Sequence, residues 1–268
     1  MQDVLKYLTW EITERGARIL GCDEKFEGAM EIPSRLDGAA VVEIGKEAFL
    51  ERHSLRSVAI PDSVEVVGEY AFSDCYELEE LHLGAGIKKI EKCAFSWCDS
   101  LQSVVIPGSV EVVGEGAFAF CVELEELQLG AGIKKIENTA FRECSSLQSV
   151  IILGSVEVVG EEAFFRCGDL EELHLGAGIK KIEDSAFQSC SSLKSVAIPD
   201  SVEDVGGGAF AFCEGLKELR LGRGIKKIEE YAFWACSSLR RVVLPSTLEA
   251  LARDAFNKNV DLVFDDER

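Results

Sequence analysis

Hydrophobic and polar positions alternate in short runs along most of the chain. In 101–106 and 124–129 the apolar residues follow Leu-x-x-Val-x-Ile or Leu-x-x-Leu-x-Leu, which is the period-two pattern of a strand with one buried face. A proline or glycine then ends each run, as at Pro107 and Gly130. A second, shorter extended segment follows before the next turn. The pattern therefore predicts two strands in each sequence unit, both with one face in the core.

The unit that carries these strands is 23 residues long and begins with an Ala-Phe pair. Its phenylalanine recurs without a slip at Phe49, Phe72, Phe95, Phe118, Phe141, Phe164, Phe187, Phe210, Phe233 and Phe256. A period of about 20–29 residues with leucines at constant offsets is typical of a leucine-rich-repeat solenoid. Each coil of such a fold contacts only its neighbours. We expect a right-handed superhelix of 23-residue β-rich coils with a parallel sheet on the concave face.

The unbroken period predicts one domain with a cap at each end. Residues 1–31 form the expected N-terminal cap, a hairpin-like segment. Residues 32–254 form the solenoid, with an irregular first repeat and then nine repeats from residue 48, and 255–268 form the C-terminal cap. Caps are needed because a stacked core would otherwise lie open to water. The apolar residues expected to close the two ends are Trp10, Ile12, Ile19, Val260, Leu262 and Val263.

Eight of the ten cysteines share the period of the phenylalanines. They are Cys75, Cys98, Cys121, Cys144, Cys167, Cys190, Cys213 and Cys236. Neighbours in such a ladder lie about 4.8 Å apart with parallel side chains, whereas a disulfide needs converging Cβ atoms. We therefore expect buried free thiols, which are typical of a reducing compartment. Cys22 and Cys93 fall outside the ladder and are the candidates for exposure.

The consensus LxSVxIPxSVxxVGxxAFxxC, as in 55–75, resembles the BspA-like class of leucine-rich repeats. The resemblance covers about residues 30–256, most of the chain. It implies the solenoid fold and a role in adhesion or in contact with host proteins, since members of this class are typically surface or secreted proteins of bacteria and protists. This chain departs from them because residues 1–16 lack the basic and apolar segments of an export signal.

The charge balance narrows the classes of partner. The chain has 28 basic and 48 acidic residues and a net charge of −20, which disfavours binding to nucleic acid or to anionic lipid. The charge fits a cationic protein partner, and equally a surface that only maintains solubility. No apolar run approaches the ~20 residues of a membrane span. We expect a monomer in the cytoplasm, or at the cell surface or secreted if the chain is an excerpt of a longer precursor.

No group of residues predicts catalysis, a metal site or a cofactor. The three histidines are His53, His82 and His174. The last two occupy the same repeat position four repeats apart, so about 20 Å separates them and they cannot share a metal. The Gly-Ala-Gly-Ile-Lys-Lys segments lack the spacing and the Lys-Ser/Thr ending of a phosphate-binding loop. We expect the protein not to be an enzyme.

The outward positions of the longer strands form the first candidate binding surface. One column alternates serine with glutamate, and a second column varies more than its surroundings. Variation inside near-identical repeats fits either a diversified binding face or merely tolerated, solvated positions. The candidate partner-binding residues are Glu80, His82, Val105, Glu126, Gln128, Ile151, Glu172, His174, Glu218 and Arg220.

Two further columns of equivalent repeat positions carry aromatic residues and alternating charges. Trp97 and Phe120 stand just before the cysteines of adjacent repeats; they form either an exposed aromatic patch for a partner or buried turn residues. Glutamate and lysine alternate at every repeat from Glu65 to Glu249, which indicates cross-strand pairs that stabilise the stack.

The sequence thus predicts a non-catalytic protein-interaction scaffold that binds a partner protein on its concave face. The alternative is a structural spacer or an adhesin-like surface module without a specific concave ligand.

Overall fold

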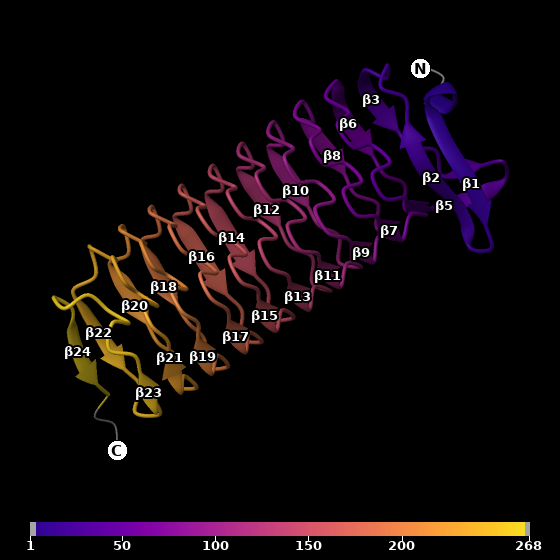
Figure 1. The fold of residues 1–268 in the computed structure, drawn as a ribbon. Helices are drawn as coiled ribbons and strands as arrows, with labels where there is room; N and C mark the ends of the chain where they lie inside the picture. Colours follow the sequence, from indigo (N-terminus) through magenta and orange to yellow (C-terminus); the bar gives the residue numbers. More distant parts are fainter. Residues whose placement is uncertain (1–3, 266–268) are drawn as a thin grey trace.

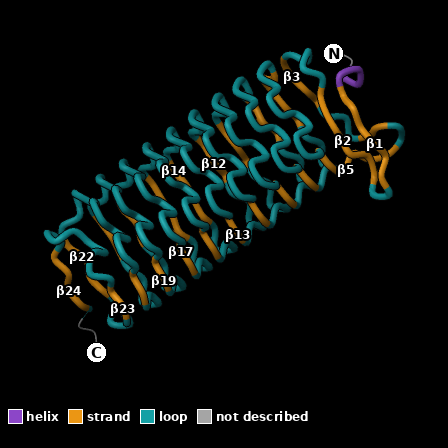
Figure 2. The backbone as a smooth tube through the Cα atoms, viewed as in Figure 1, coloured by secondary structure: helices purple, strands orange, loops and turns teal. Residues whose placement is uncertain are grey.

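The computed structural model describes residues 4–265 and is a β-solenoid of about eleven coils (Figure 1). Parallel strands stack along two sides of the coils, and turns and loops connect them (Figure 2). The leucine-rich-repeat solenoid expected from the 23-residue period is confirmed. The two chain ends lie at opposite ends of the molecule (Figure 1).

Each coil contributes one strand of two residues to the first side, which we call the short-strand face. Its ladder runs in register along the molecule; Val112, for example, pairs with Lys89 on one side and Lys135 on the other. The strands are β5 (Ala39–Ile44), β7 (Val66–Val67), β9 (Lys89–Ile90), β11 (Val112–Val113), β13 (Lys135–Ile136), β15 (Val158–Val159), β17 (Lys181–Ile182), β19 (Asp204–Val205), β21 (Lys227–Ile228) and β23 (Ala250–Leu251). The longer β5 belongs to the irregular first coil.

The second side carries longer strands and is called the long-strand face; it is the sheet expected on the concave side. Its strands are β3 (Gly28–Glu31), β6 (Leu55–Ala59), β8 (Glu80–His82), β10 (Ser103–Val105), β12 (Glu126–Gln128), β14 (Ser149–Ile152), β16 (Glu172–Leu175), β18 (Ser195–Ala197), β20 (Glu218–Arg220), β22 (Arg241–Leu244) and β24 (Asp261–Phe264). The alternating pattern explains its two faces, because Leu127 is buried between the exposed Glu126 and Gln128.

The third side of each coil is the turn that contains the Ala-Phe pair, and we call it the turn edge. Its ten phenylalanines form one continuous stack, with ring centroids 4.6 Å apart at the closest step and 5.5 Å at the widest. The cysteine ladder lies beside the stack, and all eight thiols are buried and free. Each Sγ donates to the carbonyl of the phenylalanine one coil earlier, as in Cys144 to Phe118 at 3.2 Å.

An antiparallel hairpin begins the chain. After the 3-10 helix η1 (Val4–Tyr7), β1 (Leu8–Thr13) pairs with β2 (Gly16–Cys22), and β2 continues the short-strand sheet into β5. The short β4 (Arg35–Leu36) also pairs with β5. Of the residues expected to close this end, Ile19 is buried and Trp10 is half-buried, with its Nε1 donating to Asp37 at 2.8 Å. Ile12 is 54% exposed, contrary to expectation, because β1 ends the sheet.

Strand β24 closes the other end by pairing in parallel with β22. Val260 is buried and Val263 is half-buried, in agreement with the expected inward positions. Leu262 is exposed, which corrects the expectation for it. It is in register with the buried Val242, but no later coil covers it.

The two cysteines outside the ladder differ from each other. Cys93 is half-buried, whereas Cys22 is buried, so the expected exposure of Cys22 is wrong. Cys22 lies at the end of β2, where its backbone N–H donates to the carbonyl of Ala48 in the first coil. Burial raises the pKa of its thiol to about 11.

Candidate functional site

The ten residues predicted for partner binding lie on the long-strand face, and all ten side chains are exposed. They come from strands β8 to β20 and occupy the outward positions of each alternation. Neighbouring members of a column lie one coil apart, as Glu126 and Ser149 do in the pairing of β12 with β14. The structure therefore brings the predicted residues together as two parallel rows on one surface.

The long-strand face is not a uniform sheet, because every second junction between coils is loosely paired. Strands β10 and β12 pair at three positions, whereas β12 and β14 pair only at Glu126 and Ser149. The same single pair joins β16 to β18, and the sheet is interrupted between β8 and β10 and between β20 and β22. Each loose junction follows a strand of the Leu-x-x-Leu-x-Leu version. The junctions therefore follow the alternation of the two strand versions, although the period-two pattern of either version does not by itself predict looser pairing.

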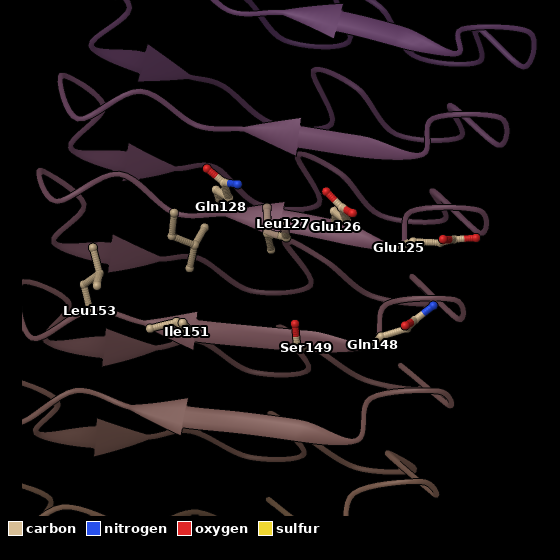
Figure 3. A pocket seen from close by; sticks show the side chains of 9 residues that line it. Glu125, Glu126, Leu127, Gln128, Gln148, Ser149, Ile151 and Leu153 are labelled. Atoms are coloured by element: carbon tan, nitrogen blue, oxygen red, sulfur yellow. The ribbon is translucent and has the colours of Figure 1, made fainter.

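Shallow grooves open at these junctions, and we call them the acidic grooves. The groove between β12 and β14 has a volume of about 510 Å³ (Figure 3). Glu125 and Gln148 lie at one end of it, and Ile151 and Leu153 lie at the other (Figure 3). The equivalent groove between β8 and β10, of about 490 Å³, is lined by the predicted residues Glu80, His82 and Val105. Both of these grooves thus present a carboxylate beside an exposed apolar side chain.

A third groove extends the acidic surface, but it lies between β14 and β16, which pair at four positions. It has a volume of about 470 Å³, and its lining includes Glu171 and Glu172. Glu126 and Glu172 form no ion pair among residues 4–265, and Glu80 accepts a hydrogen bond from Ser57 at 3.3 Å. Three of the four predicted glutamates therefore line grooves.

The remaining three predicted residues have different surroundings. His174, Glu218 and Arg220 are exposed but line none of these grooves. Around Glu218 the face becomes basic through Lys217, Arg220 and Arg240. Lys194 and Arg241 also lie there, but they pair with Glu171 and Asp261. The long-strand face is therefore acidic in its middle and basic toward β22.

Sequence reasoning missed this polarity and the column that produces it. The position directly before the serine/glutamate column carries Glu79, Glu125 and Glu171 in the middle coils and Lys194 and Lys217 later. Glu125 and Gln148 line the largest acidic groove. The sequence does contain this information, because aligning the repeats places these residues in one column whose charge changes from acidic to basic along the chain.

The histidines cannot form a joint site. His82 and His174 are both exposed and lie four coils apart. Among residues 4–265 no group of three or more His, Cys, Asp or Glu side chains is arranged to hold a metal ion.

The second candidate patch lies on the turn edge, away from the long-strand face. The rings of Trp97 and Phe120 stack face to face with centroids 4.1 Å apart and an interplanar angle of 7°. Trp97 is exposed and Phe120 is half-buried. Both residues have left-handed backbone conformations, with φ of 59° and 63°, which bulky residues seldom adopt. Exposed aromatic residues in such turns are candidates for contact with a partner.

The glutamate and lysine column lies on the short-strand face and is largely paired. Lys88 reaches Glu65 at 3.1 Å, Lys180 reaches Glu157 at 3.0 Å, and Lys226 reaches Glu203 at 2.7 Å. The hydrogen bond and charge of the lysine lower the pKa of Glu65 and of Glu203. Exposed pairs of this kind contribute at most about 1 kcal/mol each. The column fits a role in the register of the stack better than a role in binding.

No helix within the described part of the chain has the length and apolar character needed to cross a membrane.

The sequence and the structure are both similar to those of known leucine-rich-repeat proteins. The model of the BspA type leucine-rich repeat region, in six copies, matches residues 42–171 and 157–263. A leucine-rich repeat protein of T. pallidum has a similar structure, with a TM-score of 0.65, 31% identity, and coverage of 70% of this chain and 88% of that one.

Two other solved structures share the fold at lower identity. A leucine-rich repeat protein of Bacteroides ovatus has a TM-score of 0.57 and 23% identity, with 98% of this chain and 90% of that chain covered. A leucine rich cell surface protein of Faecalibacterium prausnitzii has a TM-score of 0.53 and 24% identity, with 93% and 84% covered. No curated protein matches the chain.

Proposed function

The chain belongs to the BspA-type leucine-rich-repeat family, and from this premise we propose that it is a non-catalytic scaffold that binds a cationic partner protein on its long-strand face. Leucine-rich-repeat proteins generally mediate protein interactions, and a rigid stack of coils presents an extended surface for that purpose. The binding surface consists of the acidic grooves at β8/β10 and β12/β14, extended by the third groove between β14 and β16. The site residues are those predicted on these strands, with Glu80, Glu126 and Glu172 as the charged anchors.

The observation that carries this proposal is the pairing of a carboxylate without an ion-pair partner and an apolar side chain in the same groove. Val105 and Ile151 are each exposed beside such a carboxylate. A basic side chain of the partner would meet the carboxylate, while its aliphatic stem or an apolar neighbour would cover Val105 or Ile151. Charge of this kind mainly sets the association rate and the specificity. The basic end of the face around Lys217 would repel the same partner and so fix its direction of binding.

The alternative function is a structural spacer or an adhesin-like surface module without a specific ligand on this face. Proteins of the BspA type are often surface-associated, and one structural relative is a cell surface protein. The free thiols fit the cytoplasm. Eight of these thiols are buried and hydrogen-bonded, so they would also resist oxidation outside the cell. The spacer differs from the scaffold in that its long-strand face binds no specific ligand.

A charge-reversal experiment separates the two functions. We would make the triple variant Glu80→Lys, Glu126→Lys and Glu172→Lys and use it with the parent chain to capture partners from a native extract. We expect a partner that the parent retains and the variant loses, with the affinity of the parent falling as salt is raised.

The matched control is a second triple variant at exposed glutamates outside this face. Glu14, Glu24 and Glu51 are exposed and form no ion pair among residues 4–265. Each reversal adds two charges, so both triple variants change the net charge from −20 to −14. Loss of the partner from both variants would indicate non-specific attraction to an acidic protein. Capture that neither variant changes would reject the long-strand face as the binding site.

A further inference from the structure

A second group of aromatic side chains lies on the turn edge near the C-terminal end of the solenoid. Phe212, Tyr231 and Trp234 are 37%, 48% and 41% exposed. The ring of Trp234 is nearly perpendicular to both others, at 85° and 5.0 Å from Phe212 and at 82° and 6.2 Å from Tyr231. The three rings border a hollow of about 720 Å³, which we call the edge hollow. It lies outside the long-strand face and does not depend on the function proposed for that face.

The edge hollow exists because one coil lacks side chains where its neighbours have them. Gly208 occupies the position that is Ser185 in the coil before and Tyr231 in the coil after, and Ala211 likewise stands between Gln188 and Trp234. Ser185 and Tyr231 have the same left-handed backbone as Gly208, with φ of 56° and 62°. The backbone therefore does not require glycine there, and the absence of a side chain leaves open space beside the rings.

The rim of the edge hollow is acidic. Glu161, Asp184 and Glu230 line it, and no lysine, arginine or histidine does. None of these three carboxylates forms an ion pair among residues 4–265. The charge of Lys227 does reach Asp184, but Lys227 is paired with Glu229 at 2.5 Å. The hollow thus combines aromatic faces with negative charge, and both attract cations.

Elsewhere on the turn edge, arginines of the chain itself occupy a similar combination of an aromatic ring and carboxylates. The guanidinium groups of Arg142 and Arg166 lie 4.5 and 5.1 Å from the ring centroid of Phe165. Arg142 also pairs with Glu162, and Arg166 pairs with Glu143 at 3.0 Å. Phe165 occupies the same repeat position as Trp234, three coils away. At Trp234 the ring and the carboxylates are present, but no internal arginine lies among the lining residues.

We propose that the edge hollow binds an arginine side chain of a partner protein. The planar guanidinium stacks on an aromatic face while its N–H groups pair with carboxylates, as Arg142 does between Phe165 and Glu162. Trp234 and Tyr231 supply the faces, and Glu230 and Asp184 supply the acceptors. The comparable hollow at Trp97 is a poorer candidate, because its rings cover each other and Arg142 already lines it.

The test uses the indole N–H signals of the tryptophans, which number three in the chain. The Trp234 signal is assigned by its loss in a Trp234→Phe variant. The probes are N-acetyl-argininamide, its neutral analogue N-acetyl-citrullinamide, and tetramethylammonium, each titrated at constant ionic strength. We expect argininamide to shift the Trp234 signal with saturation, with the signals of Trp10 and Trp97 unmoved, and to bind about tenfold more tightly than citrullinamide.

A filled hollow provides the second arm. Ala211→Arg places a guanidinium where Arg142 stands in its own coil, and it should reduce the response of Trp234 to argininamide at least about tenfold. Ala119→Arg, the same change four coils earlier, is the matched control and should leave that response unchanged. Circular dichroism checks that both variants are folded.

Three results would overturn the proposal. The first is a Trp234 shift no larger than that of Trp97. The second is equal binding of citrullinamide, or of tetramethylammonium, which would remove the requirement for a guanidinium. The third is an undiminished response of folded Ala211→Arg.

Discussion

At the scale of single residues, the ladder cysteines act as small apolar side chains that also donate a hydrogen bond. The distance from Sγ to the phenylalanine carbonyl of the preceding coil is 3.2 Å for Cys75 and 3.4 Å for Cys190. Desolvation raises the pKa of every ladder thiol, to about 12 for Cys121. A buried thiol that is held in its neutral form is inert toward electrophiles.

This burial predicts how the thiols react. In the folded protein at pH 8 we expect one thiol, that of the half-buried Cys93, to react with a small aromatic disulfide reagent. All ten should react in denaturant. Because burial also raises the pKa of Cys93, its reaction should be slower than that of a free thiol. A Cys93→Ser variant should show no reactive thiol in the folded state. Two fast thiols in the parent would contradict the burial of Cys22 or of the ladder, and three or more would contradict the burial of the ladder.

At the scale of the elements, stability resides in contacts between neighbouring coils, and the phenylalanine stack shows this most directly. Phe141 lies between Phe118 and Phe164, with centroids at 5.5 and 5.2 Å. Phe256 has a ring neighbour only on one side, Phe233 at 5.0 Å. Packing energy in a solenoid is a sum of nearest-neighbour terms, so the position in the stack should determine the cost of removing a ring.

We therefore expect Phe141→Ala to lower the free energy of unfolding by about 3–5 kcal/mol, and Phe256→Ala to lower it by about half as much. Urea unfolding followed by circular dichroism measures both, with the slope m compared to verify that the same surface unfolds. Equal losses at the two positions would show that the neighbouring rings do not determine the cost.

The elements also show how far the sequence alone could go. The strands, the phenylalanine stack and the cysteine ladder were predictable from the sequence. Each of these positions recurs every 23 residues in the same environment, so one repeat checks the assignment made for another. Ile12 and Leu262 were predicted wrongly because the end elements lie outside the repeat and have a neighbour on one side only. The loose junctions depend on how whole coils pack, so no single repeat reveals them. The edge hollow exists because Gly208 and Ala211 are small, whereas the equivalent residues of the next coil are Tyr231 and Trp234.

At the scale of the whole molecule, the ladder makes the protein sensitive to alkaline pH. Eight thiols lie in one apolar row, and their pKa in the unfolded chain is near 9.0. Above that pH the unfolded chain releases the thiol protons, whereas the folded protein retains those of Cys75 and Cys121 up to about pH 12. The unfolded state then binds fewer protons than the folded state, so stability is full below pH 9 and falls as pH rises.

Each retained thiol proton costs about 1.4 kcal/mol per pH unit in this range. Lysines and tyrosines also titrate there, and the ladder is therefore tested by difference. In a Cys144→Ala, Cys167→Ala double variant the free energy of unfolding should be lower than in the parent at pH 7.5. The free energy of unfolding of the variant should also fall less steeply than that of the parent between pH 9.5 and 10.5, by about 2.4 kcal/mol per pH unit. Urea titrations across this range measure both slopes. Parallel slopes in parent and variant would mean that the buried thiols do not limit stability at high pH. The loss would then come from the lysines and tyrosines, whose titration makes an already acidic protein more negative.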